Sequence, residues 1–114
     1  MKDWIQINEI IDKLSCVVIN KSDKINIKWV VASGLMSDVL TTEHDEILLV
    51  SNLTTSQIVR TADMVDANAI LICNGKKLAI DTIELAKELN ITVLVTKYPI
   101  FESCYILGKL FYEE

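Results

Sequence analysis

Three strongly apolar runs, each followed by a segment of helical periodicity, constrain the fold more than any other feature of the chain. The runs are ILLV at residues 47–50, AILIC at 69–73 and ITVLV at 91–95. A strand that is apolar at every position is covered on both faces, which is typical of parallel sheets. Strands that alternate with helices need right-handed crossover connections. The sequence therefore predicts an α/β fold with a mainly parallel sheet of about five strands flanked by helices.

Apolar residues at helical spacing define the helices between these strands. We expect one helix after residue 56, a second over residues 79–89 and a third that has Pro99 at its first position, where a missing N–H costs nothing. Asn90 is expected to end the second helix in a left-handed conformation. The inward-facing residues predicted for the three helices are Ile58, Ala62 and Val65; Ile83, Ala86 and Leu89; and Ile100, Cys104, Leu107 and Phe111.

In the first third of the chain the alternation of strands and helices is less regular. A short helix precedes residue 15, and CVVIN at residues 16–20 and INIKWVVA at residues 25–32 are predicted as strands. Ser37 is placed to cap a short helix that carries Val39 and Leu40. With the three apolar runs, these two strands make up the predicted sheet of about five strands.

Length and charge limit the classes of protein to be considered. The 114 residues are the size of one α/β domain, expected over residues 1–114. The net charge of −5 argues against nucleic acid or an anionic membrane as the main partner, because both attract basic surfaces. We find no apolar stretch of about 20 residues and no signal-peptide pattern at the N-terminus, so we expect a cytoplasmic protein.

The cysteines predict neither a metal site nor a cofactor. Cys16, Cys73 and Cys104 are far apart in the sequence, form no CxxC pair and each lie inside an apolar run. Zinc and iron–sulfur sites need clustered ligands. We therefore interpret all three as buried thiols rather than as redox or metal ligands.

Polar residues follow the carboxyl ends of the predicted strands, which is where α/β sheets bind ligands. Because parallel strands end at one edge, we expect the loops at residues 33–37, 51–56, 74–77 and 96–98 to lie together. The ligand would be a small anion or a nucleotide. The candidate ligand-binding residues are Ser37, Asp38, Ser51, Thr54, Thr55, Asn74, Gly75, Lys76 and Lys97.

Structural roles compete with binding for several of these residues. Thr54 and Gln57 have the spacing of a capping box, which would start the helix without any ligand. Asn74-Gly75 is ordinary turn chemistry. A serine nucleophile needs a base, and the only histidine, His44, lies in the acidic tract TTEHDE, which is expected to be an exposed loop. No catalytic residue is predicted.

Three segments together resemble the DRTGG domain family, and in particular its stand-alone members that are similar to the N-terminal domain of HPr kinase/phosphorylase. The segments are GLMSDVL, LLVSNLTTSQIVRTADMVDANAILICNGK and ELAKELNITVLVTKYPIFE, and the resemblance covers nearly the whole chain. The motif that names the family is altered here to SNLTT and CNG, with Gly75 retained. The resemblance implies an α/β regulatory domain that forms dimers and is accessory to a metabolic or redox (hydrogenase-type) enzyme.

The predicted function is thus a noncatalytic regulatory or ligand-binding module that self-associates, and a nucleotide or small-anion sensor is the alternative. An HPr-kinase-like phosphotransferase is less favoured, because no glycine leads a P-loop Gly-Lys-Ser/Thr triplet. The candidate residues for a homodimer interface, or for contact with another protein, are Arg60, Tyr105, Phe111 and Tyr112. In the alternative interpretation Arg60 is a solvated surface charge or a partner for Asp63 or Asp66, and the aromatic residues cover the sheet within one chain.

Overall fold

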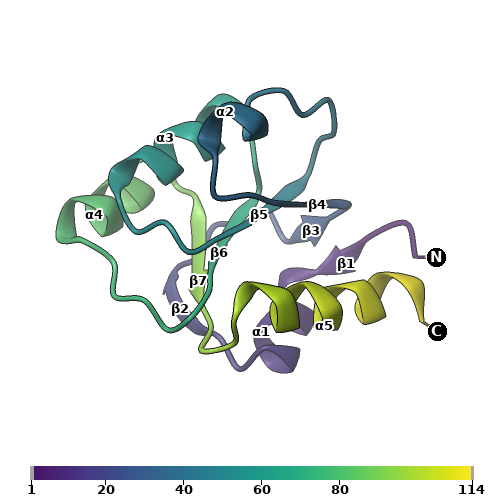
Figure 1. The fold of residues 1–114 in the computed structure, drawn as a ribbon. Helices are drawn as coiled ribbons and strands as arrows, with labels where there is room; N and C mark the ends of the chain where they lie inside the picture. Colours follow the sequence, from purple (N-terminus) through teal and green to yellow (C-terminus); the bar gives the residue numbers. More distant parts are fainter. Residues whose placement is uncertain (1, 114) are drawn as a thin grey trace.

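A computed structural model describes residues 2–113 and shows three layers, with a β-sheet between two layers of helices (Figure 1). Two helices cover one face of the sheet: α1 (Ile7–Lys13) and α5 (Ile100–Tyr112). Three helices cover the other face: α2 (Met36–Val39), α3 (Ser56–Met64) and α4 (Ile80–Glu88). Within residues 2–113 no helix has the length and apolar character needed to span a membrane.

The central sheet has five strands in the order β2-β7-β6-β5-β4. Four strands are parallel to one another: β4 (Trp29–Ala32), β5 (Ile47–Ser51), β6 (Ala69–Ile72) and β7 (Thr92–Val95). The fifth, β2 (Val17–Asn20), lies antiparallel to β7 at one edge of the sheet. The predicted α/β fold with a mainly parallel five-stranded sheet is confirmed.

The uniformly apolar runs are explained by burial on both faces. All five residues of β5 are buried. Ile47 and Leu49 belong to the core beneath α3 and α4, whereas Leu48 and Val50 belong to the core beneath α1 and α5. Since successive side chains of a strand point to opposite faces, a central strand between two helical layers needs an apolar residue at every position.

The predicted strand at residues 25–32 is wrong as a single element. The chain forms β3 (Asn26–Ile27), which pairs antiparallel with β1 (Ile5–Gln6) in a separate ribbon, and only then enters β4. The break falls at Lys28, whose N–H donates to the carbonyl oxygen of Glu46 (2.9 Å) and whose ammonium lies 3.1 Å from the carboxylate of Glu46. These two contacts turn the chain from the ribbon into the main sheet.

Helix ends follow the predictions in part. The helix predicted over residues 79–89 is α4, and Asn90 has the predicted left-handed conformation (φ 54°). Pro99 was expected at the first position of the last helix, but its ψ of 164° is extended, so it is the N-cap of α5, which begins at Ile100. Ser37 was predicted to cap α2 but lies inside that helix. The N-cap is Leu35, because the hydroxyl of Ser33 accepts the N–H of Leu35 (3.0 Å) and starts the turn earlier.

Candidate functional site

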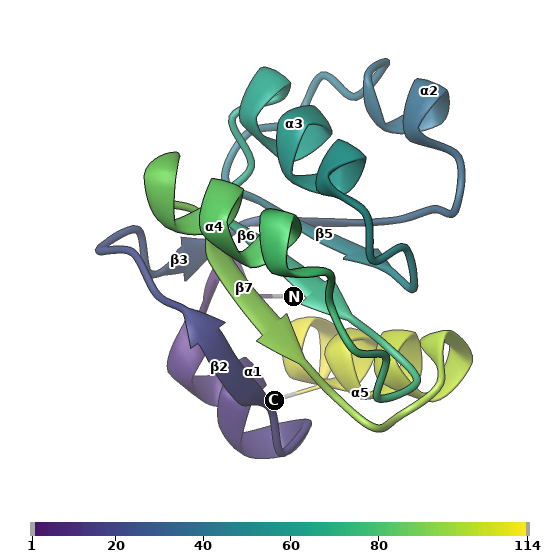
Figure 2. The same ribbon diagram turned by 90° about the vertical axis from the view of Figure 1, so that its left-hand side faces the viewer.

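The carboxyl ends of the parallel strands bring most of the predicted site residues to one edge of the sheet. In Figure 2 the arrowheads of β5 and β7 point to the same side of the molecule, and that of β2 points away. Residues 51–55 include the last residue of β5 and the loop after it, and residues 74–77 and 96–98 lie in the loops after β6 and β7; we call these three segments the carboxyl-terminal rim. They contain the candidates Ser51, Thr54, Thr55, Asn74, Gly75, Lys76 and Lys97.

Ser37 and Asp38 belong to a different part of this edge. Both are exposed and lie within α2, which follows the outer strand β4. Among the described residues they make no side-chain hydrogen bond or ion pair with the carboxyl-terminal rim. Asp38 instead uses its carbonyl oxygen to accept the hydroxyl of Thr41 (2.7 Å).

The Asn74-Gly75 turn joins the loop after β6 to the loop after β7. Both residues have positive φ angles (65° and 60°), a conformation that asparagine and glycine tolerate best. The N–H of Asn74 donates to the carbonyl oxygen of Tyr98 (2.9 Å), and that of Gly75 to the carbonyl oxygen of Thr96 (2.8 Å). These backbone donors are therefore used inside the chain, and the turn serves to position the segment that carries Lys97.

Buried hydroxyl groups complete the inner part of this rim. Ser51 is fully buried, and its hydroxyl oxygen accepts the N–H of Leu53 (3.3 Å), so this candidate stabilises the loop after β5. Thr96 is 1% exposed and donates its hydroxyl to the carbonyl oxygen of Leu14 (2.7 Å). Sequence reasoning did not identify Thr96 as a positioning residue, because its partner lies in α1's final turn, far away in the sequence.

The start of α3 differs from the predicted capping box. The N-cap is Thr55, one residue after the predicted Thr54, and no side chain caps the helix. The carbonyl oxygen of Thr54 accepts the hydroxyl of Thr82 from α4 (2.8 Å), which holds Thr54 in the loop. The first N–H groups of α3 consequently keep their hydrogen-bonding capacity and the partial positive charge of a helix N-terminus.

Two lysines add full positive charge at the same edge. Lys76 and Lys97 are exposed. A β-carbon at Gly75 would lie 3.7 Å from Cγ of Lys97, so the stem of the lysine side chain lies beside the turn. The ion pairs within residues 2–113 include neither lysine; they join Lys24 to Asp66, Lys28 to Glu46 and Lys109 to Glu113.

The three cysteines are free thiols whose surroundings suppress ionisation. Burial, with a smaller contribution from Cys73, raises the pKa of Cys16 to about 12. Burial also raises the pKa values of Cys73 and Cys104. Cys73 is fully buried, and its thiol donates to the hydroxyl oxygen of Ser103 (3.5 Å). Because the thiolate is the reactive form, these are poor nucleophiles. Cys73 is buried as predicted, whereas Cys16 and Cys104 are only partly buried.

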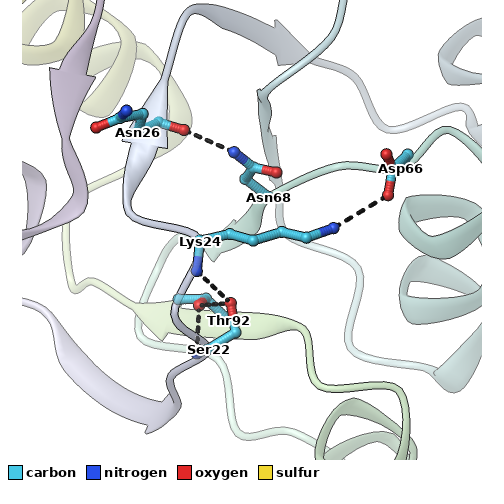
Figure 3. Close-up of polar contacts among 6 residues, drawn as sticks. All are labelled: Ser22, Lys24, Asn26, Asp66, Asn68 and Thr92. Carbon is cyan, nitrogen blue, oxygen red and sulfur yellow. Dashed lines mark hydrogen bonds and ion pairs between the residues drawn. The ribbon is translucent and has the colours of Figure 1, made fainter.

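A polar cluster that sequence reasoning missed lies at the opposite edge of the sheet (Figure 3). Lys24 pairs with Asp66 (3.2 Å), and the amide of Asn68 donates to the carbonyl oxygen of Asn26 (2.7 Å). A cavity of about 370 Å³ beside them is lined by Asp23, Lys24, Ile25, Asn26, Glu46, Asp66 and Asn68. Its three carboxylates disfavour an anion. The polar turn KSDK at residues 21–24 is the one feature of the sequence that points to this cluster. The residue types in the turn do not reveal that Asp66 and Asn68 lie beside it.

The predicted interface residues lie on different surfaces. Phe111 is 5% exposed and packs in the core beneath α5, so it covers the sheet within the chain, as the alternative interpretation expected. Tyr105 and Tyr112 are exposed on α5. Arg60 is exposed on α3, which covers the other face of the sheet, and it forms no ion pair with Asp63 or Asp66.

An apolar groove separates α5 from the edge strand β4. Its volume is about 260 Å³. We call it the β4–α5 groove, and its lining residues are Lys28, Trp29, Val30, Ala32, Cys104, Leu107, Gly108, Phe111 and Tyr112.

Among solved structures, the chain is similar to the crystal structure of the CBS and DRTGG domains of the regulatory region of Clostridium perfringens pyrophosphatase, complexed with the activator diadenosine tetraphosphate. The TM-score is 0.73 at 20% sequence identity, over 90% of this chain and 45% of that one. The chain thus spans less than half of the chain that it matches. No family model matches the sequence, and no curated protein matches it. The likeness shows the fold.

Proposed function

We propose that the chain is a noncatalytic regulatory module that binds a small phosphate-bearing anion, such as a nucleotide, at the carboxyl-terminal rim. The observation that carries this proposal is the convergence of three positive groups at one edge of the sheet. They are the N-terminus of α3, which has no side-chain cap, and the ammonium groups of Lys76 and Lys97. Helix N-termini and lysines are the usual partners of phosphate groups in proteins.

The hydrogen bonds within the rim limit which groups would touch the ligand. The N–H groups of Asn74 and Gly75 and the hydroxyl of Ser51 have partners inside the chain. Donors that remain include the N–H groups of Ser56 and Gln57 at the start of α3, the exposed hydroxyl of Thr55 and the two lysines. Phosphoryl transfer is not part of the proposal, because the sequence has no P-loop.

The similar solved structure supports the class of ligand and the regulatory role. It is a regulatory region in complex with a dinucleotide polyphosphate activator. By analogy, the present module would sense a phosphate-bearing metabolite and act on a separate metabolic or redox (hydrogenase-type) enzyme. Self-association, which the family resemblance implies, is part of the same proposal.

Thermal denaturation in the presence of chosen anions tests the binding proposal. The probes are inorganic phosphate, ATP and diadenosine tetraphosphate. A ligand present at a hundred times its Kd stabilises the folded state by about 2.7 kcal/mol, which for a domain of this size raises the Tm by roughly 10 °C. Unchanged melting curves with all three probes would contradict the proposal.

A further inference from the structure

The edge strand β4 is short, and His44 stacks on Trp29 at its first residue (ring centroids 3.9 Å apart), but several other features that usually protect a sheet edge are missing. It pairs only with β5, so its other side presents unpaired backbone groups. Between Trp29 and Ala32 the strand has no charged residue, no proline and no register shift. The opposite edge, β2, is interrupted by a register shift between Val18 and Asn20. Natural proteins protect or cover exposed sheet edges, so we expect another polypeptide segment to cover β4.

An exposed aromatic stripe on α5 lies beside this edge. Phe101, Tyr105 and Tyr112 are 83%, 61% and 63% exposed, and with Gly108 they recur at i, i+4, i+7 and i+11 on one side of the helix. Gly108 and Tyr112 line the β4–α5 groove together with Trp29. The C-terminal half of the stripe therefore lies beside the edge strand β4. Aromatic residues are enriched in the cores of protein interfaces.

Gly108 is an independent sign of an interface. It lies in the interior of α5, where glycine costs roughly 0.5–1 kcal/mol relative to alanine. A β-carbon at this position would meet no atom within 4 Å, so nothing inside the chain requires glycine. The close approach of a backbone from outside the chain would require it.

We propose that β4 and α5 form the interface of a symmetric homodimer. Strand β4 pairs antiparallel with β4 of a second copy, and the two α5 helices pack antiparallel along their aromatic stripes, centred near Tyr105 with Gly108 one turn away. This inference rests on the self-association included in the proposed function, and it adds the surface and the symmetry. With a twofold axis, both copies use the same surface for the contact. No further copy can add to that surface, so the assembly contains two chains.

The charges on α5 suit a second copy. In an antiparallel pair of α5 helices centred near Tyr105, Glu102 of one chain lies opposite the partner subunit's Lys109. The residues from Trp29 to Ala32 and those of the aromatic stripe are themselves uncharged, and the ammonium group of Lys109 lies over the ring of Tyr105, 5.4 Å from its centroid. Opposite charges thus meet at the border, and no like charges face one another across the interface.

The exposed area also fits a dimer. Trp29 is 36% exposed, and an aromatic side chain has an area of roughly 200 Å². On that basis Trp29, Phe101, Tyr105 and Tyr112 together expose roughly 500 Å², more than half of the ~800 Å² per partner in a standard interface. The unpaired edge of β4 and the β4–α5 groove supply further area, since the groove can receive an aromatic side chain of the partner.

Light scattering coupled to size-exclusion chromatography, over a range of protein concentrations, tests the inference. The wild-type chain should elute with twice the mass of one chain. Gly108→Arg and Tyr105→Arg should each raise the dimer dissociation constant on the order of 30-fold or more, because they place a charge at the centre of the interface. Both positions are open in the single chain, so circular dichroism should remain that of the wild type.

Ile80→Arg is the matched control, because Ile80 is 75% exposed on α4, away from this surface. It should leave the dimer intact. A dimer that survives both α5 substitutions would overturn the assigned surface but not self-association. A wild-type chain that is monomeric at every concentration would overturn both, whereas ligand binding at the carboxyl-terminal rim would still be judged by the thermal experiment.

Discussion

The hydroxyl of Thr96 donates a 2.7 Å hydrogen bond to the carbonyl oxygen of Leu14, which lies 82 residues earlier in the chain. This bond joins the end of β7 to the last turn of α1 and satisfies a carbonyl group at a helix terminus. It also anchors the loop that carries Lys97, because the carbonyl oxygen of Thr96 accepts the N–H of Gly75. One threonine thus links a helix end to the geometry of the carboxyl-terminal rim.

Replacing Thr96 with valine should lower the free energy of unfolding by about 1–3 kcal/mol, because the carbonyl oxygen of Leu14 would stay buried without its partner. Urea denaturation measures the change. Thr41→Val is the control: its hydroxyl also donates to a backbone carbonyl, that of Asp38, but the residue is exposed. The control should change stability by less than about 0.5 kcal/mol. Equal effects of the two substitutions would show that the Thr96 bond has no special role.

Lys97→Gln should weaken binding of diadenosine tetraphosphate about tenfold, since it removes one unpaired positive charge from the carboxyl-terminal rim. Isothermal titration calorimetry at constant ionic strength measures the change in Kd. Lys87→Gln, on the exposed surface of α4, makes the same change in net charge outside the rim. Equal losses of affinity in the two variants would mean that only the overall charge matters.

The raised pKa values of the cysteines predict a loss of stability at alkaline pH. In the unfolded chain the thiols lose their protons near pH 9, whereas in the folded protein burial keeps Cys16 protonated up to about pH 12. The unfolded state therefore binds fewer protons between these values, and the free energy of unfolding falls as pH rises through that range.

A comparison between wild type and Cys16→Ala isolates the contribution of this thiol. The variant should show a smaller decrease in stability between pH 8 and pH 10 in urea denaturation. At neutral pH, all three thiols of the folded wild-type chain should react with a thiol reagent more slowly than those of the chain in denaturant. Parallel pH profiles for the two proteins would argue against a buried, protonated Cys16.

Leu71→Ala should cost about 2–5 kcal/mol, because Leu71 is fully buried on a central strand. Ile80→Ala removes a similar aliphatic side chain from the exposed surface of α4 and should have little effect. Chemical denaturation of both variants measures the contrast. A similar cost at the two positions would contradict the two-sided burial of β6.

The two-sided burial of β5 explains why the main fold could be predicted from the sequence. A run such as ILLV, with no polar position, is stable as a strand only between two helical layers, so the parallel sheet and its carboxyl edge follow from local pattern. The division of residues 25–32 could not be predicted, because Ile27 and Trp29 have similar propensities although they enter different sheets.

Long-range partners explain the errors at the helix starts and in the candidate site. Thr82 from α4 holds the carbonyl oxygen of Thr54, which shifts the start of α3 by one residue. In the same way, only the pairing of the loops after β6 and β7 reveals that the N–H of Gly75 is already used. Residue spacing predicts which loops gather at an edge, but not which of their donors remain free.

Residue-by-residue NMR chemical-shift titration with diadenosine tetraphosphate tests the central claim, which is binding of a phosphate-bearing ligand at the carboxyl-terminal rim. The largest shifts of the backbone amide signals should fall in residues 54–57, 74–77 and 96–98, and they should saturate with added ligand. Saturable shifts confined to the opposite edge, around Lys24 and Asp66, would contradict the account. So would the absence of any saturable shift at millimolar ligand concentration.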